Sequence, residues 1–297
     1  MDKTLRGATE MIAAMTILGS IGWFVIISGQ PAIDVVFWRC VFGALALLVI
    51  CGLQGALRHR LTWRTAGLAA LGGVAIVVNW AMLFSAYGQA SISIATAVYN
   101  MQPFILVGFG ALFLSERITA TKLGWLAIAF AGVVMIVQAR PDTGYTGANY
   151  ALGIALALGA AFFWALAALI TKKLSGTPPH LIALIQVGVG IAMLAPFASW
   201  AEPPQGPAAW GALVTLGVVH TGLMYTLMYG AVQKLPTYLQ GAFSFVYPVV
   251  AILVDHLAFG HRLQPVQIAG AAAIIIAAAG LTFGWRLLGR RRQAQAS

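Results

Sequence analysis

The sequence predicts an all-α protein that crosses a membrane many times, and three observations lead to this prediction. Hydrophobic residues make up 61% of the 297 residues and charged residues only 8%, which is too few charges to cover a water-facing surface. Apolar windows of about 20 residues recur along the chain, and each is long enough to cross a hydrocarbon layer of roughly 30 Å. These windows are too long for barrel strands, and backbone groups in lipid must be satisfied internally, so we expect helices.

The two halves of the chain resemble each other around two prolines. Pro103 stands between residues 99–102 and an apolar run to residue 114, and Pro248 has the same place between residues 244–247 and a run to residue 259. The two prolines are 145 residues apart, as are Arg117 and Arg262, which follow the two runs. A doubled apolar chain is typical of membrane transporters, whose substrate sites form between the repeats near the middle of the bilayer.

Gly, Pro and charged residues divide the apolar windows into ten expected spans. The first window is longer than the core of a signal peptide and lacks a cleavage site, so we expect it to remain as a span. We therefore predict ten transmembrane helices around a central cavity, in two five-helix repeats at residues 1–140 and 149–297, joined by a linker at 141–148. The spans are residues 8–28, 33–53, 65–87, 93–114, 121–139, 149–171, 180–200, 208–232, 238–259 and 265–287.

Five spans per half is an odd number, so the second repeat enters the membrane from the opposite side and the repeats are inverted. With a cytoplasmic N-terminus, fourteen of the seventeen lysines and arginines fall in cytoplasmic segments, as the positive-inside rule requires. The sequence thus predicts an inner-membrane protein with both termini in the cytoplasm. The basic residues are dispersed between spans, which argues against a nucleic-acid partner. The fourteen are Lys3, Arg6, Arg58, Arg60, Arg64, Arg117, Lys122, Lys172, Lys173, Lys234, Arg286, Arg290, Arg291 and Arg292.

Polar side chains inside a bilayer are costly unless they have partners, so they tend to face the bundle interior or a wet cavity. Tryptophans deep in a span either fill core space or line such a cavity. We expect rings to surround the side chain of a small substrate while Asn79 and Asn100 bind its charged ends. The candidate substrate-binding residues are Trp23, Asn79, Trp80, Tyr99, Asn100, Gln102, Trp164, His220, Tyr225, Phe243 and Tyr247.

Pro103, Pro248 and His220 have two open interpretations each. Pro103 and Pro248 fall at the centre of their spans, where a proline either packs as an ordinary transmembrane residue or bends the helix and shapes a pathway. Their matched placement favours a pathway-shaping role. His220 lies at the centre of the eighth span, where it either ties two helices together as a neutral ring or contacts substrate.

Charged residues limit the mechanism. None of the seven acidic residues falls near the middle of a span, so exchange of protons through a buried carboxylate is not expected. Arg39 lies about one and a half turns from the outer edge of its span, and we expect its side chain to extend outward to water. We therefore do not expect phosphorylated substrates, because no central cation balances a phosphate. No cofactor and no metal site are indicated.

At these residues the chain resembles the drug/metabolite transporter superfamily, and within it the EamA-type ten-helix carriers, over essentially its whole length. In the second copy His261 stands where the first has Glu116, so the pattern does not require that acid. Overall likeness is greatest to the YddG-type amino acid exporters. The residues that carry the resemblance are 99–103, 245–248, Ser115, Glu116, Arg117, Gly124 and Gly132.

The resemblance implies a carrier that exports aromatic and other neutral amino acids, or similar small metabolites, by alternating access. Its expected partners are a small-molecule substrate and the lipid bilayer, and we expect a monomer. A membrane-embedded enzyme is the main alternative, but it needs a nucleophile with a base, a metal cluster or paired carboxylates at one depth. The sequence offers none of these. A narrow channel, and cationic drugs or other metabolites as substrates, remain open alternatives.

Overall fold

The computed structural model describes residues 3–89, 95, 98–138, 149–200, 203–259 and 264–286. These residues form a bundle of helices with no strand among them, which confirms the all-helical prediction for the described part of the chain. The predicted linker at 141–148, the pair His261 and Arg262, and the basic tail beyond residue 286 lie outside the described residues.

The helices follow one another in the order of the expected spans. The first half contributes α1 (Lys3–Gly19), α2 (Ile21–Ser28), α3 (Ala32–Leu53), α4 (Trp63–Gln89), α6 (Gln102–Leu114) and α7 (Ala120–Gln138). The second half contributes α8 (Tyr150–Lys173), α9 (Pro179–Leu194), α10 (Gly206–Gly217), the π-helical segment η3 (Val218–Leu223), α11 (Met224–Lys234), α12 (Thr237–Ser244), α13 (Val246–Phe259) and α14 (Pro265–Thr282). Short 3-10 turns follow α3 and α9, at η1 (Ala56–Arg58) and η2 (Ala195–Phe197).

Several helical segments have the length and composition of membrane spans. Within the described residues there are seven of at least 18 residues, and α6 and the segment Ala120–Met135 are shorter apolar helices. A protein with this many apolar helices belongs in a membrane. The seven segments are Lys3–Val25, Ala32–Leu53, Trp63–Leu83, Ala151–Lys173, Pro179–Phe197, Gly206–Lys234 and Pro265–Thr282.

Local sequence signals set several helix ends. Pro179 and Pro265 stand in the first turn of α9 and α14, where the missing backbone N–H has no intrahelical partner to lose. Asn149 caps α8, because its side-chain Oδ1 accepts a hydrogen bond of 3.1 Å from the backbone N–H of Leu152. These signals begin helices where the sequence places the expected spans.

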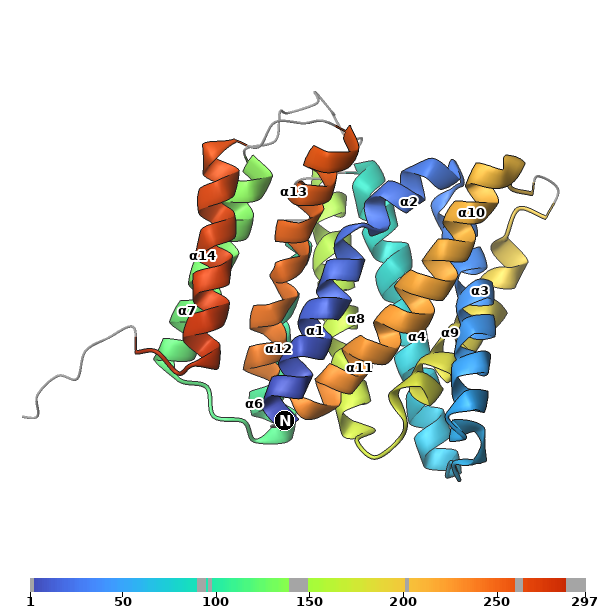
Figure 1. The fold of residues 1–297 in the computed structure, drawn as a ribbon, viewed down its shortest axis with the longest axis horizontal. Helices are drawn as coiled ribbons and strands as arrows, with labels where there is room; N and C mark the ends of the chain where they lie inside the picture. The colour runs from blue at the N-terminus through green and yellow to red at the C-terminus, as the bar shows by residue number, and fades with distance from the viewer. Residues whose placement is uncertain are drawn as a thin grey trace, which may run out of the picture.

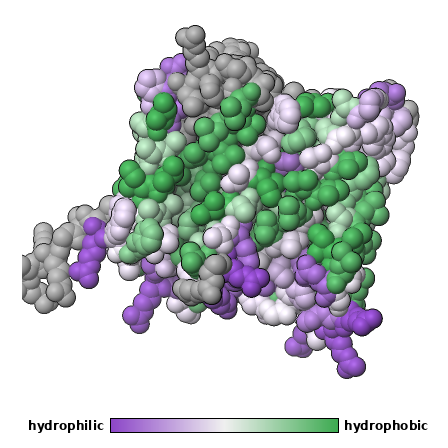
Figure 2. Space-filling model, viewed as in Figure 1, coloured by the Kyte–Doolittle hydropathy of each residue, from purple (hydrophilic) through white to green (hydrophobic). Residues whose placement is uncertain are grey.

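The surface carries a broad apolar band. Figure 2 shows hydrophobic residues covering the middle of the bundle and hydrophilic residues gathered at its two ends. Large apolar side chains in this band are well exposed, which is costly in water and favourable against lipid tails. Examples from five different helices are Leu48, Leu71, Leu158, Leu257 and Ile275.

The helices pair in a pattern that is unchanged when the two halves are exchanged. Exchanging the halves turns the contact between α4 and α8, the third and sixth expected spans, into the contact between α1 and α11, the first and eighth. Further contacts join corresponding helices of the two halves, α3 with α9, α6 with α12 and α7 with α14. In Figure 1, α7 and α14 form one edge of the bundle, and α3 and α9 lie at the other.

The bundle has two ends, at which different helices begin and end. At the N-terminal end, marked N in Figure 1, α1 begins and α6, α8 and α11 end. At the opposite end, α2 leads into α3 and α10 begins.

Candidate functional site

Four of the expected spans are interrupted in their interior. The first breaks at Ser20 between α1 and α2, and the eighth widens into η3. The fourth and ninth break at corresponding places, with Met101 before α6 at φ −72° and ψ −14°, and Phe245 before α13 at φ −72° and ψ −7°. Each of these two breaks lies within three residues of a proline, Pro103 or Pro248. A proline deep in a helix removes a hydrogen bond and clashes with the preceding turn, so a new helix begins instead.

Asn79 connects α4 to α8 and to Tyr99, which precedes the break in the fourth span. It is fully buried on α4, and its side-chain Nδ2 donates to the backbone oxygen of Ala160 on α8 at 2.7 Å and to the hydroxyl of Tyr99 at 3.2 Å. Its Oδ1 has no hydrogen-bond partner among the described residues, and the same is true of Oε1 of buried Gln102. Two buried acceptors therefore remain available beside the break in the fourth span, and buried polar groups normally have partners.

The π-helical segment η3 positions His220 in the interior. Its Nε2 lies 2.9 Å from the hydroxyl oxygen of Ser20, at the break in the first span, and its Nδ1 lies 3.3 Å from the backbone oxygen of Thr215. The ring of Phe24 packs against the imidazole at a centroid distance of 5.1 Å. His220 thus ties the first and eighth spans together at two backbone irregularities. Such π-bulges occur frequently at functional sites, and nothing in the sequence pattern predicted this one.

The expectation that Arg39 extends outward to water is wrong. Its side chain turns into the bundle and is only 3% exposed. Its Nε donates to the hydroxyl of Thr221 at 2.8 Å and its Nη2 to the backbone oxygen of His220 at 3.3 Å, both in η3. The guanidinium carbon lies 4.5 Å from the ring centre of Trp80. The π-helical turn supplies the acceptors and the ring supplies a cation-binding face, so the charge finds partners without reaching water.

Trp80 and Tyr225 complete this group, which we call the Arg39 cluster (Arg39, Trp80, His220, Thr221 and Tyr225). The Tyr225 ring is 5.8 Å from the guanidinium carbon and packs edge-on against Trp80 at 6.0 Å. The cluster joins α3 and α4 of the first half to η3 and α11 of the second half. Three of its members were expected from the sequence as substrate contacts, whereas Arg39 and Thr221 were not. An arginine inside an apolar span was the signal for Arg39.

The other expected site residues lie on other elements. Trp164, on α8, lines a cavity of about 10 Å³ together with Ile76 and Tyr229, which is about the space of one water molecule. Trp23 is 37% exposed on α2 and packs edge-on against Phe24. The structure therefore does not bring Trp23 into the Arg39 cluster. The remaining residues are Asn100 and Phe243, which are buried, and Tyr247, which is partly buried on α13.

A larger cavity opens at the opposite end of the bundle. It has a volume of about 460 Å³ and lies between the α2–α3 connection and the segment that precedes α10. Asp34, in the first turn of α3, contributes to its lining while its Oδ1 accepts a hydrogen bond of 2.7 Å from the backbone N–H of Ser199. The full lining is Gly29, Gln30, Pro31, Asp34, Ser199, Pro203 and Gln205.

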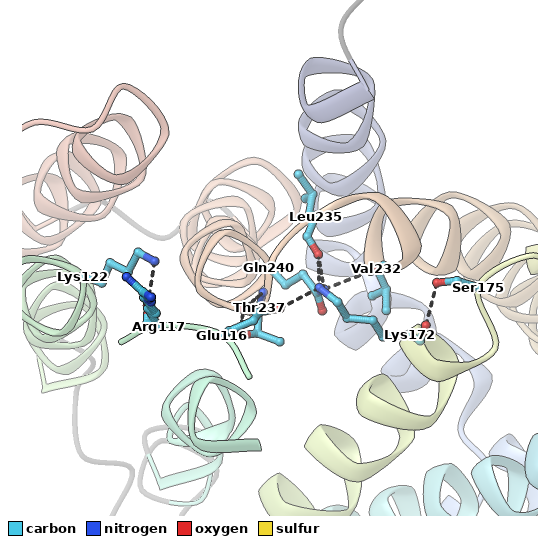
Figure 3. Close-up of polar contacts among 9 residues, drawn as sticks. All are labelled: Glu116, Arg117, Lys122, Lys172, Ser175, Val232, Leu235, Thr237 and Gln240. Carbon is cyan, nitrogen blue, oxygen red and sulfur yellow. Dashed lines mark hydrogen bonds and ion pairs between the residues drawn. The ribbon is translucent and has the colours of Figure 1, made fainter. Parts of the chain in front are cut away.

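The N-terminal end is held by ion pairs between the two halves, and Figure 3 shows the one made by Glu116. Glu116, just after α6, pairs with Lys172 of α8 at 3.0 Å and accepts hydrogen bonds from the backbone N–H and the hydroxyl of Thr237, at 2.9 and 2.7 Å. We call these three residues the Glu116 clasp. Lys172 also donates to the backbone oxygen of Leu235 at 2.6 Å. Because Thr237 begins α12, the carboxylate also lies at a helix N-terminus, where negative charge is favoured.

A second ion pair reinforces the same end. Glu10 of α1 pairs with Lys234 at the end of α11 at 2.5 Å, and it also accepts from Arg6 of its own helix at 3.1 Å. In both contacts between the halves, the first half supplies the acid and the second half supplies the lysine. These partly buried pairs close the N-terminal end, while the cavity of about 460 Å³ opens at the other.

Comparison with known families places this architecture. The EamA-like transporter family matches the chain twice, at residues 5–138 and 151–283. The chain belongs to this family. Membership means that the protein is a membrane transporter. The expected assignment to the drug/metabolite transporter superfamily is confirmed.

Individual relatives of this EamA-like transporter agree with that assignment. The chain is 30% identical to the "uncharacterized transporter YxxF" of Bacillus subtilis, over 89% of this chain and 86% of the relative. It is 25% identical to the "probable terminal-alkyne amino-acid exporter" of Streptantibioticus cattleyicolor, over 86% and 85% of the two chains. A solved crystal structure has the same fold, with a TM-score of 0.81 and 21% identity over 95% of this chain and 96% of the other.

The Glu116 clasp of this transporter gives a prediction about pH. Burial raises the pKa of Glu116, but the hydrogen bonds from Thr237 and the ion pair with Lys172 outweigh it, so the net pKa lies below the ordinary value of 4.5. A carboxyl whose folded-state pKa is depressed stabilises the fold above its unfolded pKa and loses that contribution as the pH falls through the folded value. We expect Glu116→Gln to lower the melting temperature of the purified protein equally from about pH 8 to about pH 6, with the difference shrinking below about pH 4.5.

Thermal unfolding of both proteins across this range is the measurement. A difference that already shrinks between pH 8 and pH 6 would contradict the assigned ionisation of Glu116. The exposed Arg6→Gln variant is the control, because it removes an ion pair within a single helix.

Proposed function

We propose that this EamA-like transporter is a carrier that exports amino acids, aromatic and other neutral ones, by alternating access. The observation that carries the proposal is the Arg39 cluster, in which α3 and α4 of the first half meet η3 and α11 of the second half inside the bundle. A carrier must replace the water around the charged ends of a zwitterion with protein groups at an interface that can open to either side. Buried polar groups and rings at this interface meet that requirement.

The proposed architecture is ten transmembrane helices in two inverted five-helix repeats, at residues 1–140 and 149–297. The helix pairing supports it, because exchanging the halves turns the α4–α8 contact into the α1–α11 contact. The corresponding breaks before Pro103 and Pro248 support it too. Discontinuous helices of this kind form substrate sites in other transporters built from inverted repeats.

The proposed orientation places both termini in the cytoplasm of a bacterial cell, with the protein in the inner membrane. Lys3, Arg58, Arg117, Lys173 and Lys234 all lie at or beyond helix ends on the N-terminal side of the bundle. An excess of lysine and arginine marks the cytoplasmic side of a membrane protein. The Glu116 clasp then closes the cytoplasmic side, and the cavity of about 460 Å³ faces outward.

The substrate class is supported by a relative and by the chemistry of the interior. The relative from Streptantibioticus cattleyicolor is named as an amino-acid exporter. The described interior offers a guanidinium, aromatic rings and the unpaired acceptors on Asn79 and Gln102. A zwitterion with an apolar or aromatic side chain presents complementary groups.

Reconstitution tests this proposal. The purified protein is placed in liposomes with a panel of labelled amino acids, with and without a pH gradient. We expect saturable uptake and counterflow of at least one neutral amino acid. Flux that shows neither saturation nor counterflow indicates a channel, and absence of flux for the whole panel would overturn the amino-acid proposal. Uptake that depends on the pH gradient indicates that proton movement is coupled to transport.

Three alanine variants test the interior residues. We expect Trp164→Ala, Tyr99→Ala and His220→Ala each to reduce uptake by about tenfold or more, because each removes a ring or hydrogen bond from the bundle interior. Membrane expression should be retained. The matched control is Trp63→Ala, since Trp63 is 83% exposed at the start of α4. Unchanged uptake kinetics in all three variants would remove these residues from the site.

A further inference from the structure

We propose that Arg39 binds the carboxylate of the transported substrate. The inference deepens the proposed function and rests on it, since it assigns one half of the amino acid to one side chain. The site consists of the guanidinium, held between η3 and Trp80, and its ligand is the carboxylate of a small zwitterion or organic acid.

The first argument is charge balance. An arginine inside the apolar layer is costly unless an anion or other partner compensates it. Seven acidic residues occur in the chain, and Glu10, Asp34 and Glu116 are those whose side chains the structure describes. Glu10 and Glu116 pair with lysines at the N-terminal end, and Asp34 accepts from the backbone of Ser199. Within the described part of the chain, Arg39 therefore has hydrogen bonds and aromatic faces but no counter-ion.

The second argument is geometry. Thr221 donates its own hydroxyl hydrogen to the backbone oxygen of Leu216 at 2.9 Å, so its oxygen is free to accept from Nε of Arg39 at 2.8 Å. That bond and the one from Nη2 to the backbone oxygen of His220 use two of the five N–H donors of a guanidinium. Trp80 lies against the guanidinium at 4.5 Å. The planar group is thereby oriented before any ligand arrives, which favours bidentate binding of a carboxylate.

The third argument is position. Arg39 is five residues beyond Asp34 on α3, which corresponds to roughly 7.5 Å along the helix axis. Asp34 lines the outward cavity of about 460 Å³. Arg39 is thus attached to α3 about one and a half turns deeper in the bundle than the cavity lining. The partners of Arg39 come from both halves. A carboxylate bound to Arg39 therefore lies at the interface that must rearrange during transport.

The experiment compares an acid with its amide. Uptake of a labelled amino acid into liposomes is measured in the presence of unlabelled inhibitors. The inhibitors are L-phenylalanine, L-phenylalaninamide, 3-phenylpropanoate, L-threonine and L-threoninamide. The amide keeps the ammonium group and side chain but lacks the carboxylate. For the wild-type protein we expect the inhibition constant of each amide to be about tenfold or more higher than that of its acid. The amide cannot form the charge-assisted pair with the guanidinium.

Variants of the cluster locate the effect. We expect R39Q to weaken inhibition by the amino acid about tenfold or more and to abolish the difference between acid and amide. R39K should retain part of that difference, since it keeps the charge but loses the planar fork. T221V should weaken inhibition less than R39Q. T226V is the matched control, because Thr226 lies one turn further along and donates to the backbone oxygen of Gly222.

The outcomes separate this inference from the proposed function. If R39Q transports amino acids with the wild-type preference for acid over amide, Arg39 does not bind the carboxylate, although amino-acid export stands. If no amino acid is transported but 3-phenylpropanoate stabilises the purified wild-type protein against heat and not the R39Q protein, the carboxylate site stands and the proposed function fails. If R39Q is not recovered as a folded protein, equal inhibition by acid and amide in the wild type still overturns the inference.

Discussion

Gly217→Ala is expected to destabilise the folded protein by about 3 kcal/mol or more, the upper range for overpacking a tight contact. Gly217 ends α10 where it crosses α3, and an added Cβ atom would collide with Cβ of Phe42 and lie 2.8 Å from the backbone nitrogen of Gly43. Backbone atoms cannot move aside as a side chain can. Small residues allow this close approach of two membrane helices, and η3 with the Arg39 cluster begins at the next residue.

The measurement is the melting temperature and the monodisperse yield of the detergent-purified protein. The matched control is Gly211→Ala, because Gly211 lies on the same helix and an added Cβ atom meets nothing within 4 Å. We expect the control to be as stable as the wild type or slightly more stable, since alanine favours helix. Equal melting temperatures for the two variants would show that α3 and α10 are not packed as described.

Removing both ion pairs between the halves is expected to open the N-terminal end. In the double variant Glu10→Gln and Glu116→Gln, the pairs with Lys234 and Lys172 are lost and the bonds from Thr237 are weakened. Hydrogen bonds to a charged group contribute about 1.5–3 kcal/mol, and exposed ion pairs less. We expect a combined loss of about 2 kcal/mol or more from the closed state. That shifts its population roughly thirtyfold toward the open state.

Labelling of an introduced cysteine measures this shift. Ala168→Cys, in a protein with Cys40 and Cys51 replaced by alanine, places a thiol beside Trp164 in the small cavity on α8. Reaction with a membrane-impermeant maleimide from the N-terminal side should be about tenfold or more faster in the double variant. Arg6→Gln serves as the control, because its ion pair lies within α1. Equal labelling rates in the double variant and the wild type would exclude these pairs as a gate.

Several features of the fold follow from the sequence through simple physical rules. Apolar windows of membrane-spanning length predicted the helices, because lipid leaves the backbone no other partner. Pro179, Pro265 and Asn149 marked helix starts through their own backbone and side-chain chemistry. The double match to one family follows the same repetition that relates Pro103 to Pro248.

The site was less accessible to sequence reasoning. Depth within a span selected Trp80, His220 and Tyr225, which meet in the Arg39 cluster, but it also selected Trp23, which packs at a partly exposed position. Depth gives the height of a residue and not the direction in which it points. For Arg39 the direction decided the outcome, because its long side chain reaches either the membrane surface or the interior from the same backbone position.

The sequence by itself determined the class of this protein. Composition, the length of the apolar windows and the internal repeat can each be read from the chain without knowing which helices pack together. The tertiary structure alone decided that Ser20 meets His220, that Arg39 finds Thr221 across 182 residues, and that Glu116 meets Lys172. These contacts depend on which helix faces lie together. They also depend on the π-helical geometry of η3, which sets the direction of its side chains. A local pattern carries no information about either, because the energies involved arise only once the two halves are packed.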